Sequence, residues 1–419
     1  MKAKVCAQER SESVSDTLSL AHSSGSVRER TVLFVNDTGG RMGGAERSLL
    51  AIVAALDRSH FRACAALGSD GDLAEGLRSL HMPVAVIPMA PIARTRNPLR
   101  LLKAAIQLRT SARRIVRFAE QQNVALLYAN KNTVIFPTLA AARRLARPSL
   151  WHVRNRAARF GWIGSWVVRH YSKLLFMSEA LREPFDRAFP QLRHKFATLH
   201  EGIPLEPFAE LDLSARRRIR TELGVPLDAP LIGMIGRITP WKGQAEFVEA
   251  AAIVLKDCPD AYFLVVGDCI SSPAEALADA RYRDQVQAQR DALGLHDRVI
   301  FSGHREDVPA LLAAMDVFVL PSIEEPYGLV LLEAMAAGVP TVATSAGGVP
   351  EIAEDHVHAL LVLAGRPDEL ARGVIELLRA PDAARTMAKR AEAHVKDQLS
   401  HRAFMEKLQD ILEALTIDS

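Results

Sequence analysis

The stretch that most constrains the fold runs from Val319 to Ile352 and includes the sequence Gly347-Gly-Val-Pro-Glu351 near its end. An apolar run at its start ends at Leu320, a short acidic loop follows, and a helix is predicted over residues 328–338. That helix is apolar on all sides except for Glu333. A helix of this kind is a buried helix, and an ionised carboxylate is rarely buried without a partner. The stretch therefore predicts a strand, a loop and a buried helix, with an acid among its apolar residues.

The start of this helix is a predicted anion site. Its first backbone N–H groups have no partner within the helix, so those of Gly328, Leu329 and Val330 should face the loop at the positive end of the helix dipole. Phosphate is the usual occupant of such a site. Glu333 could accept hydrogen bonds from both hydroxyls of a vicinal diol, such as that of a ribose. The structural alternative is that Glu333 forms a salt bridge inside a packed helix.

A second loop supplies positive charge. The sequence Gly236-Arg-Ile-Thr-Pro-Trp-Lys-Gly243 opens at the end of a predicted strand and closes into a helix. Arg237 and Lys242 can converge on one diphosphate, the arginine through its planar fork and the lysine as a point charge. Two solvated surface cations would be the alternative interpretation.

Together these stretches resemble a known family. Glu325 and Glu333 are separated by seven residues within the pattern P-S-x-x-E-x-Y-G-x-x-x-x-E-A-M-A-x-G-x-P. This composite resembles the E-x7-E signature of family 4 of the retaining GT-B glycosyltransferases, also called glycosyl transferases group 1. The loop from Gly236 to Gly243 looks like the G-R-x-x-x-x-K-G block of the same family. The resemblance covers roughly residues 31–395, and its motifs are concentrated after residue 231.

The resemblance implies a fold and a set of site residues. The implied fold class is α/β with GT-B architecture, in which two Rossmann-like doubly wound domains face each other across a cleft. The implied catalytic residues are Arg237, Lys242, Glu325 and, at a strand end of the first domain, His152. The implied donor-binding residues are Gly43, Gly44, Gly236, Gly303, His304, Tyr327, Gly328, Leu329, Val330 and Glu333. For His152, a buried structural histidine is the alternative.

The chain in order predicts two domains. Strand-like apolar runs alternate with helical stretches from Thr31 onward, which is typical of a doubly wound parallel sheet. Ligands of such sheets bind at the carboxyl ends of strands. The predicted division is a disordered lead over residues 1–29, an acceptor domain over 30–205, a nucleotide-sugar domain over 206–395, and a final helix within 396–419 that crosses back to the first domain.

The cysteine spacing, the length of the apolar runs and the distribution of charge indicate where a protein of this sequence is expected to act. The four cysteines lie far apart with no C-x-x-C pair, which suggests reduced thiols in a cytosol. No apolar run reaches 18 residues, so no spanning helix is expected. Between Pro91 and Lys173 there are 17 lysines or arginines and one acid, Glu120. A block of this kind indicates an anionic partner.

Several aromatic residues interleave with these cations. The combination suits an anionic membrane surface and also a nucleic-acid groove. With the second domain in view, the prediction is a membrane or a lipid-linked or phosphorylated glycan, contacted through residues 94–173, and no nucleic acid. Solvated helix faces are the remaining alternative.

The sequence therefore predicts a cytosolic, peripheral-membrane glycosyltransferase. The resemblance implies transfer of a sugar from a nucleotide-sugar donor to a cell-surface glycan or lipid-linked acceptor, with retention of configuration and without a metal or other cofactor. Two alternatives stay open. One is another GT-B enzyme of the UDP-sugar 2-epimerase type, and the other is a catalytically silent GT-B module that binds a glycan or lipid.

Overall fold

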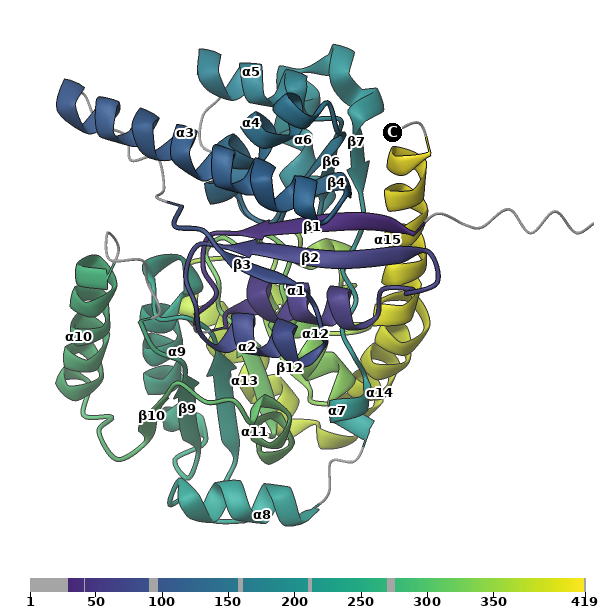
Figure 1. Ribbon diagram of the computed structural model, residues 1–419. Helices are drawn as coiled ribbons and strands as arrows, with labels where there is room; N and C mark the ends of the chain where they lie inside the picture. The colour runs from purple at the N-terminus through teal and green to yellow at the C-terminus, as the bar shows by residue number, and fades with distance from the viewer. Residues whose placement is uncertain are drawn as a thin grey trace, which may run out of the picture.

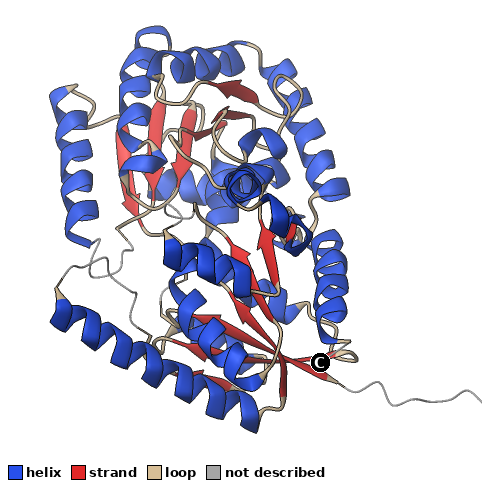
Figure 2. Cartoon of the chain, turned by 90° about the horizontal axis from the view of Figure 1, so that it is seen from above, coloured by secondary structure: helices blue, strands red, loops and turns tan. Residues whose placement is uncertain are grey.

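The computed structural model describes residues 29–40, 42–89, 97–156, 161–209, 213–269 and 276–417. The lead predicted over residues 1–29 lies outside these ranges except for Glu29. Within them the chain forms two parallel sheets, each with helices packed against it (Figures 1 and 2). The predicted α/β class with two Rossmann-like domains is confirmed.

The first sheet has seven parallel strands in the order β3-β2-β1-β4-β5-β6-β7. Its strands are β1 (Arg30–Asn36), β2 (Phe61–Leu67), β3 (Val84–Val86), β4 (Val124–Ala129), β5 (Ser149–Val153), β6 (Lys173–Phe176) and β7 (Phe196–Thr198). The connecting helices are α1 (Gly44–Ala54), α2 (Asp72–Ser79), α3 (Pro98–Gln121), η1 (Asn132–Val134), α4 (Ile135–Leu145), α5 (Trp162–His170), α6 (Glu179–Ala188) and η2 (Pro190–Lys195). The inner strands β1 and β4 are almost wholly buried, which explains their continuous apolar runs.

The second sheet has six parallel strands in the order β10-β9-β8-β11-β12-β13. Its strands are β8 (Leu231–Ile235), β9 (Tyr262–Val266), β10 (Val299–Gly303), β11 (Val317–Leu320), β12 (Thr341–Thr344) and β13 (Leu360–Val362). Its helices are α9 (Gln244–Asp257), α10 (Ala276–Ala292), α11 (Val308–Ala314), α12 (Leu329–Ala336), α13 (Pro367–Arg379) and α14 (Pro381–Gln398), with η3 (Pro240–Lys242) and η4 (Val349–Glu351) in its loops. In both sheets the strand order reverses beside the first strand, which is where doubly wound folds bind ligands.

The last helix, α15 (His401–Thr416), lies against the first domain. Its residues Phe404, Leu408 and Leu412 share a hydrophobic cluster with Val32 and Phe34 of β1. Where the chain returns, a Cβ on Gly202 would lie 2.2 Å from the carbonyl oxygen of Ser400, so only glycine fits this crossing.

The segment between the domains differs from the prediction. The polar and charged sequence Ala215-Arg-Arg-Arg-Ile-Arg220 predicts a connector that runs to about Pro230, but it lies within α8 (Leu213–Glu222), which follows the short α7 (Glu206–Ala209). Arg220 is fully buried. Its guanidinium donates to the carbonyl oxygens of Ala314 and Ala229 and to the Asp316 carboxylate. These partners compensate the burial of its charge, which the local sequence alone does not reveal.

Candidate active site

Two loops of the second domain join at an ion pair. Lys242 lies at the end of the loop after β8, and Glu325 lies in the loop after β11. The Lys242 Nζ donates to Glu325 Oε2 at 2.6 Å, and the Ser322 hydroxyl donates to the same oxygen at 2.8 Å. Both charged side chains are largely buried, at 14% and 5% exposure. The structure thus brings together two of the residues that the sequence predicts to be catalytic.

Backbone contacts fix how these loops approach each other. The N–H of Ile323 donates to the Trp241 carbonyl at 2.9 Å. A Cβ on Gly243 would lie 2.0 Å from the carbonyl oxygen of Pro321, and Gly243 has φ +77°. Glycine at position 243 is therefore required both by the close approach and by the left-handed backbone.

Arg237 lies beside Lys242 on the same indole ring. The Arg237 guanidinium carbon is 5.8 Å from the centroid of Trp241, and the Lys242 Nζ is 4.6 Å from it. Beneath this loop, a Cβ on Gly267 would lie 2.0 Å from the Gly236 carbonyl oxygen. The two predicted cations therefore flank one aromatic ring, on a loop that packs tightly against the end of β9.

The ends of β9 and β10 are joined in the same way. The N–H of Gly267 donates to the Gly303 carbonyl at 2.8 Å, and Gly303 has φ +72°. His304 follows directly and is partly exposed. The predicted donor-contacting residues Gly236, Gly303 and His304 thus lie at neighbouring strand ends of the second sheet.

The predicted helix start lies next to Glu325. Gly328 precedes α12 with φ +109°, and a Cβ on it would lie 3.5 Å from Glu325 Cγ. Glu333 lies one turn into α12, and its side chain is partly exposed. The protein around its carboxyl group nevertheless excludes enough water to raise the pKa of Glu333 to about 7, while the nearby Arg47 lowers this pKa by a smaller amount. Leu329 and Val330 pack on the core with their side chains, which leaves their N–H groups as the part of them available to a ligand.

The glycine loop of the first domain meets this helix start. A Cβ on Gly44 would lie 3.7 Å from Leu329 Cδ1, so the two domains touch here. The Glu46 carboxylate turns back to accept from the Gly43 N–H at 3.1 Å and forms an ion pair with Lys131. Gly44 therefore lies beside the start of α12, and Gly43 directly precedes it in the chain.

His152 lies in a buried polar network. It is fully buried, and its Nδ1 hydrogen-bonds to the Tyr128 hydroxyl at 2.5 Å. Burial and the nearby Arg154 hold the pKa of His152 well below its usual value, so its ring is neutral at pH 7. Among the described residues, its Nε2 has no hydrogen-bond partner. The structure places His152 beside Tyr128 and Arg154 of its own domain.

The same network continues through Arg154. Its guanidinium donates to Glu201 at 2.6 Å, to the Asn130 side chain at 3.1 Å and to the Ser48 hydroxyl at 2.8 Å. Asn130 in turn donates to Asn36 at 3.0 Å. Polar side chains from the ends of β1, β4 and β5 are thereby joined into one buried cluster.

Tyr327 takes a different position from the one predicted. Its ring is buried and stacks on His200 of the first domain at 5.8 Å, and its hydroxyl donates to the Glu201 carbonyl at 2.8 Å. The side chain therefore joins the two domains instead of facing a donor. The resemblance implies a donor contact for Tyr327, but its hydroxyl bonds to a carbonyl 126 residues away in the chain, which the local sequence does not reveal.

A second interdomain contact went unrecognised in the sequence. The Glu351 carboxylate accepts from the N–H groups of Glu179 and Ala180, at 2.7 and 2.8 Å, and from His200 Nε2 at 2.8 Å. It thus caps the start of α6 across the domain boundary. The order Gly-Gly-x-Pro-Glu was a sequence signal for this residue, but its partners could not be named from the sequence.

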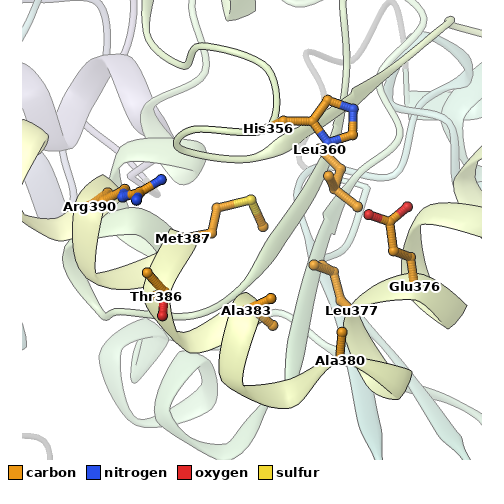
Figure 3. Close-up of a pocket in the computed structure, with 10 residues that line it drawn as sticks. His356, Leu360, Glu376, Leu377, Ala380, Ala383, Thr386, Met387 and Arg390 are labelled. Carbon is orange, nitrogen blue, oxygen red and sulfur yellow. The ribbon is translucent and has the colours of Figure 1, made fainter.

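Two cavities lie elsewhere in the molecule. One of about 320 Å³ is lined by α13, α14 and the loop that carries His356 (Figure 3). Another of about 300 Å³ lies between β7, α14 and α15. No residue predicted to contact the donor lines either cavity.

Comparisons with known proteins agree with this arrangement. Residues 215–394 match the family described as glycosyl transferases group 1. The D-inositol 3-phosphate glycosyltransferase of Mycobacterium avium is 35% identical over 199 residues, which are 47% of this chain and 44% of that protein. A GDP-mannose-dependent phosphatidylinositol monomannoside mannosyltransferase of Corynebacterium glutamicum is 30% identical over 250 residues, 58% of this chain and 62% of that protein. The chain spans about half the length of the curated relatives it matches.

Solved structures resemble the whole fold. Anabaena Alr3699/HepE in complex with UDP-glucose superimposes with a TM-score of 0.76 at 27% identity, covering 92% of this chain and 99% of that one. WaaG, a glycosyltransferase involved in lipopolysaccharide biosynthesis, has a TM-score of 0.67 at 18% identity, covering 91% and 99%. The second likeness concerns the fold alone, and both are to proteins with the GT-B arrangement of two domains.

Proposed function

We propose that this chain transfers a sugar from a nucleotide-sugar donor, because it has the GT-B fold and its residues 215–394 match the glycosyl transferases group 1. The observation that carries the proposal is the Lys242–Glu325 pair, held at 2.6 Å beside the start of α12. A cation, a carboxylate and free helix N–H groups within one small region are what a sugar diphosphate requires: positive charge for the phosphates and an acceptor for sugar hydroxyls.

The second domain would hold the donor. Arg237, Lys242 and the N–H groups at Gly328 face the diphosphate, while Glu333 accepts hydrogen bonds from the ribose hydroxyls. Glu325 already has two donors on one oxygen, so its carboxylate is fixed in orientation toward the sugar. His304 and Gly303 lie where the base would be placed. Tyr327 serves the site indirectly by joining the domains.

In the proposed reaction, the bond between the sugar C1 and the diphosphate oxygen breaks while the acceptor oxygen bonds to C1 on the same face. The acceptor proton passes to the departing phosphate. Negative charge builds up on the diphosphate, and Lys242 with Arg237 stabilises it. A well-placed group of this kind contributes roughly 3 kcal/mol to transition-state stabilisation. Because these cations supply the positive charge, we propose that the reaction is independent of a metal. Because the acceptor bonds to the same face of C1, the configuration is retained.

The proposed acceptor is a cell-surface glycan or a lipid-linked sugar, in a cytosolic setting on the inner membrane face. The Corynebacterium relative is named for a phosphatidylinositol mannoside, and WaaG for lipopolysaccharide biosynthesis, which supports an acceptor of this class. In the first domain, the acceptor would approach the strand ends of β1, β4 and β5, whose loops are held in place by the buried polar cluster.

A donor screen tests the proposal. Nucleotide sugars such as UDP-glucose, UDP-N-acetylglucosamine and GDP-mannose are added in thermal-shift experiments, with free nucleotides as controls. A ligand at 100 times its Kd stabilises the folded state by about 2.7 kcal/mol. The expected result is stabilisation by one donor, followed by release of its nucleoside diphosphate that continues in EDTA. No binding and no release across the panel would contradict the proposal.

The same assay separates the alternatives. A 2-epimerase would convert the donor into its C2 epimer without an acceptor, which NMR of the sugar detects. A silent binding module would be stabilised by a ligand but release no nucleoside diphosphate above background. A retaining transferase releases the nucleoside diphosphate and yields a product whose anomeric configuration matches that of the donor.

A further inference from the structure

The N-terminal half of α3 extends beyond the body of the first domain. The helix has 24 residues, which corresponds to about 36 Å. Its second half packs on the domain through Ile115, Val116 and Ala119, which are buried. In its first half, no residue between positions 99 and 110 is buried. Figures 1 and 2 show this end of α3 reaching past the rest of the first domain.

This half of the helix carries an apolar stripe directed to solvent. Leu99, Leu102 and Ile106 are 75%, 58% and 59% exposed. Their spacing of three and four residues places them on one side of a helix. With about 100° of rotation per residue, that side is roughly opposite the one that buries Ile115 and Ala119. Among the described residues of its domain, the stripe therefore has no partner, and it is not an extension of the packed face.

The charges around the stripe all have one sign. From Asn97 to Arg117 the helix contains no aspartate or glutamate, and it carries the cations Arg100, Lys103, Arg109, Arg113, Arg114 and Arg117. Pairing of this helix with a second copy of itself would bring like charges together, which disfavours a dimer through this face. A basic helix with an apolar stripe matches the anionic, apolar-cored surface of a lipid bilayer.

A second exposed apolar group lies on the same side of the first sheet. Trp162 and Ile163 at the start of α5 are 83% and 45% exposed. Figure 1 shows α3 and α5 on the side of the sheet that faces away from the second domain. Tryptophan is enriched at the interface between water and lipid, because its ring is both apolar and able to donate a hydrogen bond.

The basic segment predicted from the sequence is divided by the structure. Lys131 and Arg154 are engaged in ion pairs with Glu46 and Glu201. Trp151 and Tyr171 are buried in the core. Arg94, Arg96, Arg159 and Phe160 lie outside the described residues. Among the described residues of 94–173, exposed apolar groups beside cations remain on the first half of α3 and on α5, where Trp162 and Ile163 are joined by Trp166 next to Arg143.

We infer that the first half of α3, together with Trp162, docks on an anionic lipid surface, with the helix lying in the plane of the interface. No helix in the described part of the chain combines the length and apolar content needed to cross a bilayer. This surface is separate from the donor residues, so the inference does not depend on the proposed transfer reaction.

Vesicle co-sedimentation tests the inference. The full chain is mixed with vesicles of phosphatidylcholine alone or with 30% phosphatidylglycerol added, at low and at high salt. We expect binding to the anionic vesicles that weakens as salt screens the charges. The variant Leu99→Gln/Leu102→Gln/Ile106→Gln should bind at least tenfold more weakly, because the stripe no longer transfers apolar area into lipid. The matched control Leu227→Gln/Leu293→Gln/Leu363→Gln alters exposed apolar residues of the second domain and should bind as the wild type does.

A second pair of variants tests the charges. Arg100→Gln/Lys103→Gln/Arg109→Gln should weaken binding to anionic vesicles about a hundredfold, since each cation near such a surface contributes about fivefold. The control Arg372→Gln/Arg379→Gln/Arg385→Gln removes three exposed arginines of the second domain and should leave binding unchanged.

Three outcomes would overturn the inference. One is equal binding of the wild type and both α3 variants to anionic vesicles. Another is the absence of wild-type binding at low salt. The third is sedimentation velocity showing a wild-type dimer that the Leu99→Gln/Leu102→Gln/Ile106→Gln variant dissociates, which would assign the stripe to a second copy. Thermal denaturation without ligand, compared with that of the wild type, shows that each variant is folded. Failure of donor binding in the wild type would concern the proposed reaction, not this surface.

Discussion

In the first domain, the polar side chains at the ends of β1, β4 and β5 form hydrogen bonds mainly to one another. In the second domain, the polar side chains that follow β8 and β11 lie on loops whose backbone requires glycine, and they form fewer hydrogen bonds within the protein. Arg154 has three side-chain partners and is almost fully buried. Lys242 has one carboxylate partner and remains partly exposed. The two sheets share a strand order, but their strand ends are used differently.

This difference separates structural from ligand-binding charge. A buried charge whose hydrogen bonds are all made inside the protein contributes shape and rigidity. A cation with one partner at the surface of a glycine loop can exchange that partner for a phosphate. We therefore expect changes in the first cluster to lower stability and changes in the second to lower turnover.

The largest expected effect follows from Glu201→Gln. The substitution leaves the buried charge of Arg154 without its carboxylate partner, which costs about 3–5 kcal/mol of unfolding free energy. Urea denaturation at pH 7 measures the loss. The double variant Arg154→Met/Glu201→Gln should recover much of it, because no unpaired charge remains. A Glu201→Gln protein as stable as the wild type would contradict the structural role given to this cluster.

Lys242→Ala should have the opposite profile. Loss of the charge beside the departing diphosphate lowers kcat by about a hundredfold, equivalent to roughly 3 kcal/mol of transition-state stabilisation. Steady-state release of nucleoside diphosphate measures it. Lys256→Ala, at an exposed position of the following helix α9, is the control and should turn over normally. Lys242→Ala also leaves Glu325 without its cation, which lowers the free energy of unfolding. The difference in unfolding free energy between Lys242→Ala and Lys242→Ala/Glu325→Gln measures how much of this loss comes from the unpaired acid.

The two domains also differ in how much of their sites could be predicted from the sequence. The strands were predictable because buried parallel strands read as unbroken apolar runs. The second-domain loops were predictable because Gly236, Gly243 and Gly328 occur beside charged residues in a short stretch of chain. In these loops, the glycines predict the backbone geometry and the neighbouring charged residues predict the charge of the site.

Other features depend on partners far away in the chain. Arg220 is buried against the Ala314 carbonyl and the Asp316 carboxylate, 94 and 96 residues away in the chain, so the local sequence of α8 predicts a charged connector instead. Glu351 and Tyr327 belong to the domain boundary for the same reason. In the first domain no short motif identifies the polar cluster, since its members come from separate strands. What the sequence could not supply is the choice of partner.

Glu333→Gln should affect stability and binding in opposite directions. Burial raises the pKa of Glu333 to about 7, so the folded protein holds this proton more tightly than the unfolded chain does. Stability is therefore lost as pH rises from about 4.5 to about 7, and the full penalty is present above pH 7. Allowing for partial exposure, the glutamine variant should be about 2 kcal/mol more stable than the wild type at pH 8 and equally stable near pH 4.5.

Donor affinity should fall in the same variant, because an amide cannot accept both ribose hydroxyls. We expect about a tenfold increase in KM with a smaller change in kcat. Thermal denaturation between pH 4.5 and 8 and initial-rate kinetics check the two parts. A variant that loses stability at pH 8 would show that Glu333 is held by an ion pair within the fold.

Arg47→Gln should produce the smallest effect, and it links the two domains. Arg47 lies in the first turn of α1 and lowers the pKa of Glu333 on α12, partly opposing the effect of burial. Removing it should move the midpoint of the pH dependence of stability upward by roughly a few tenths of a unit, as expected for a partly solvent-screened charge. Arg58→Gln, beyond the other end of α1, should leave the midpoint unchanged. If Arg47→Gln moves this midpoint no further than Arg58→Gln does, the charge of Arg47 in the first domain does not act on Glu333. The pKa of Glu333 is then set by the second domain alone.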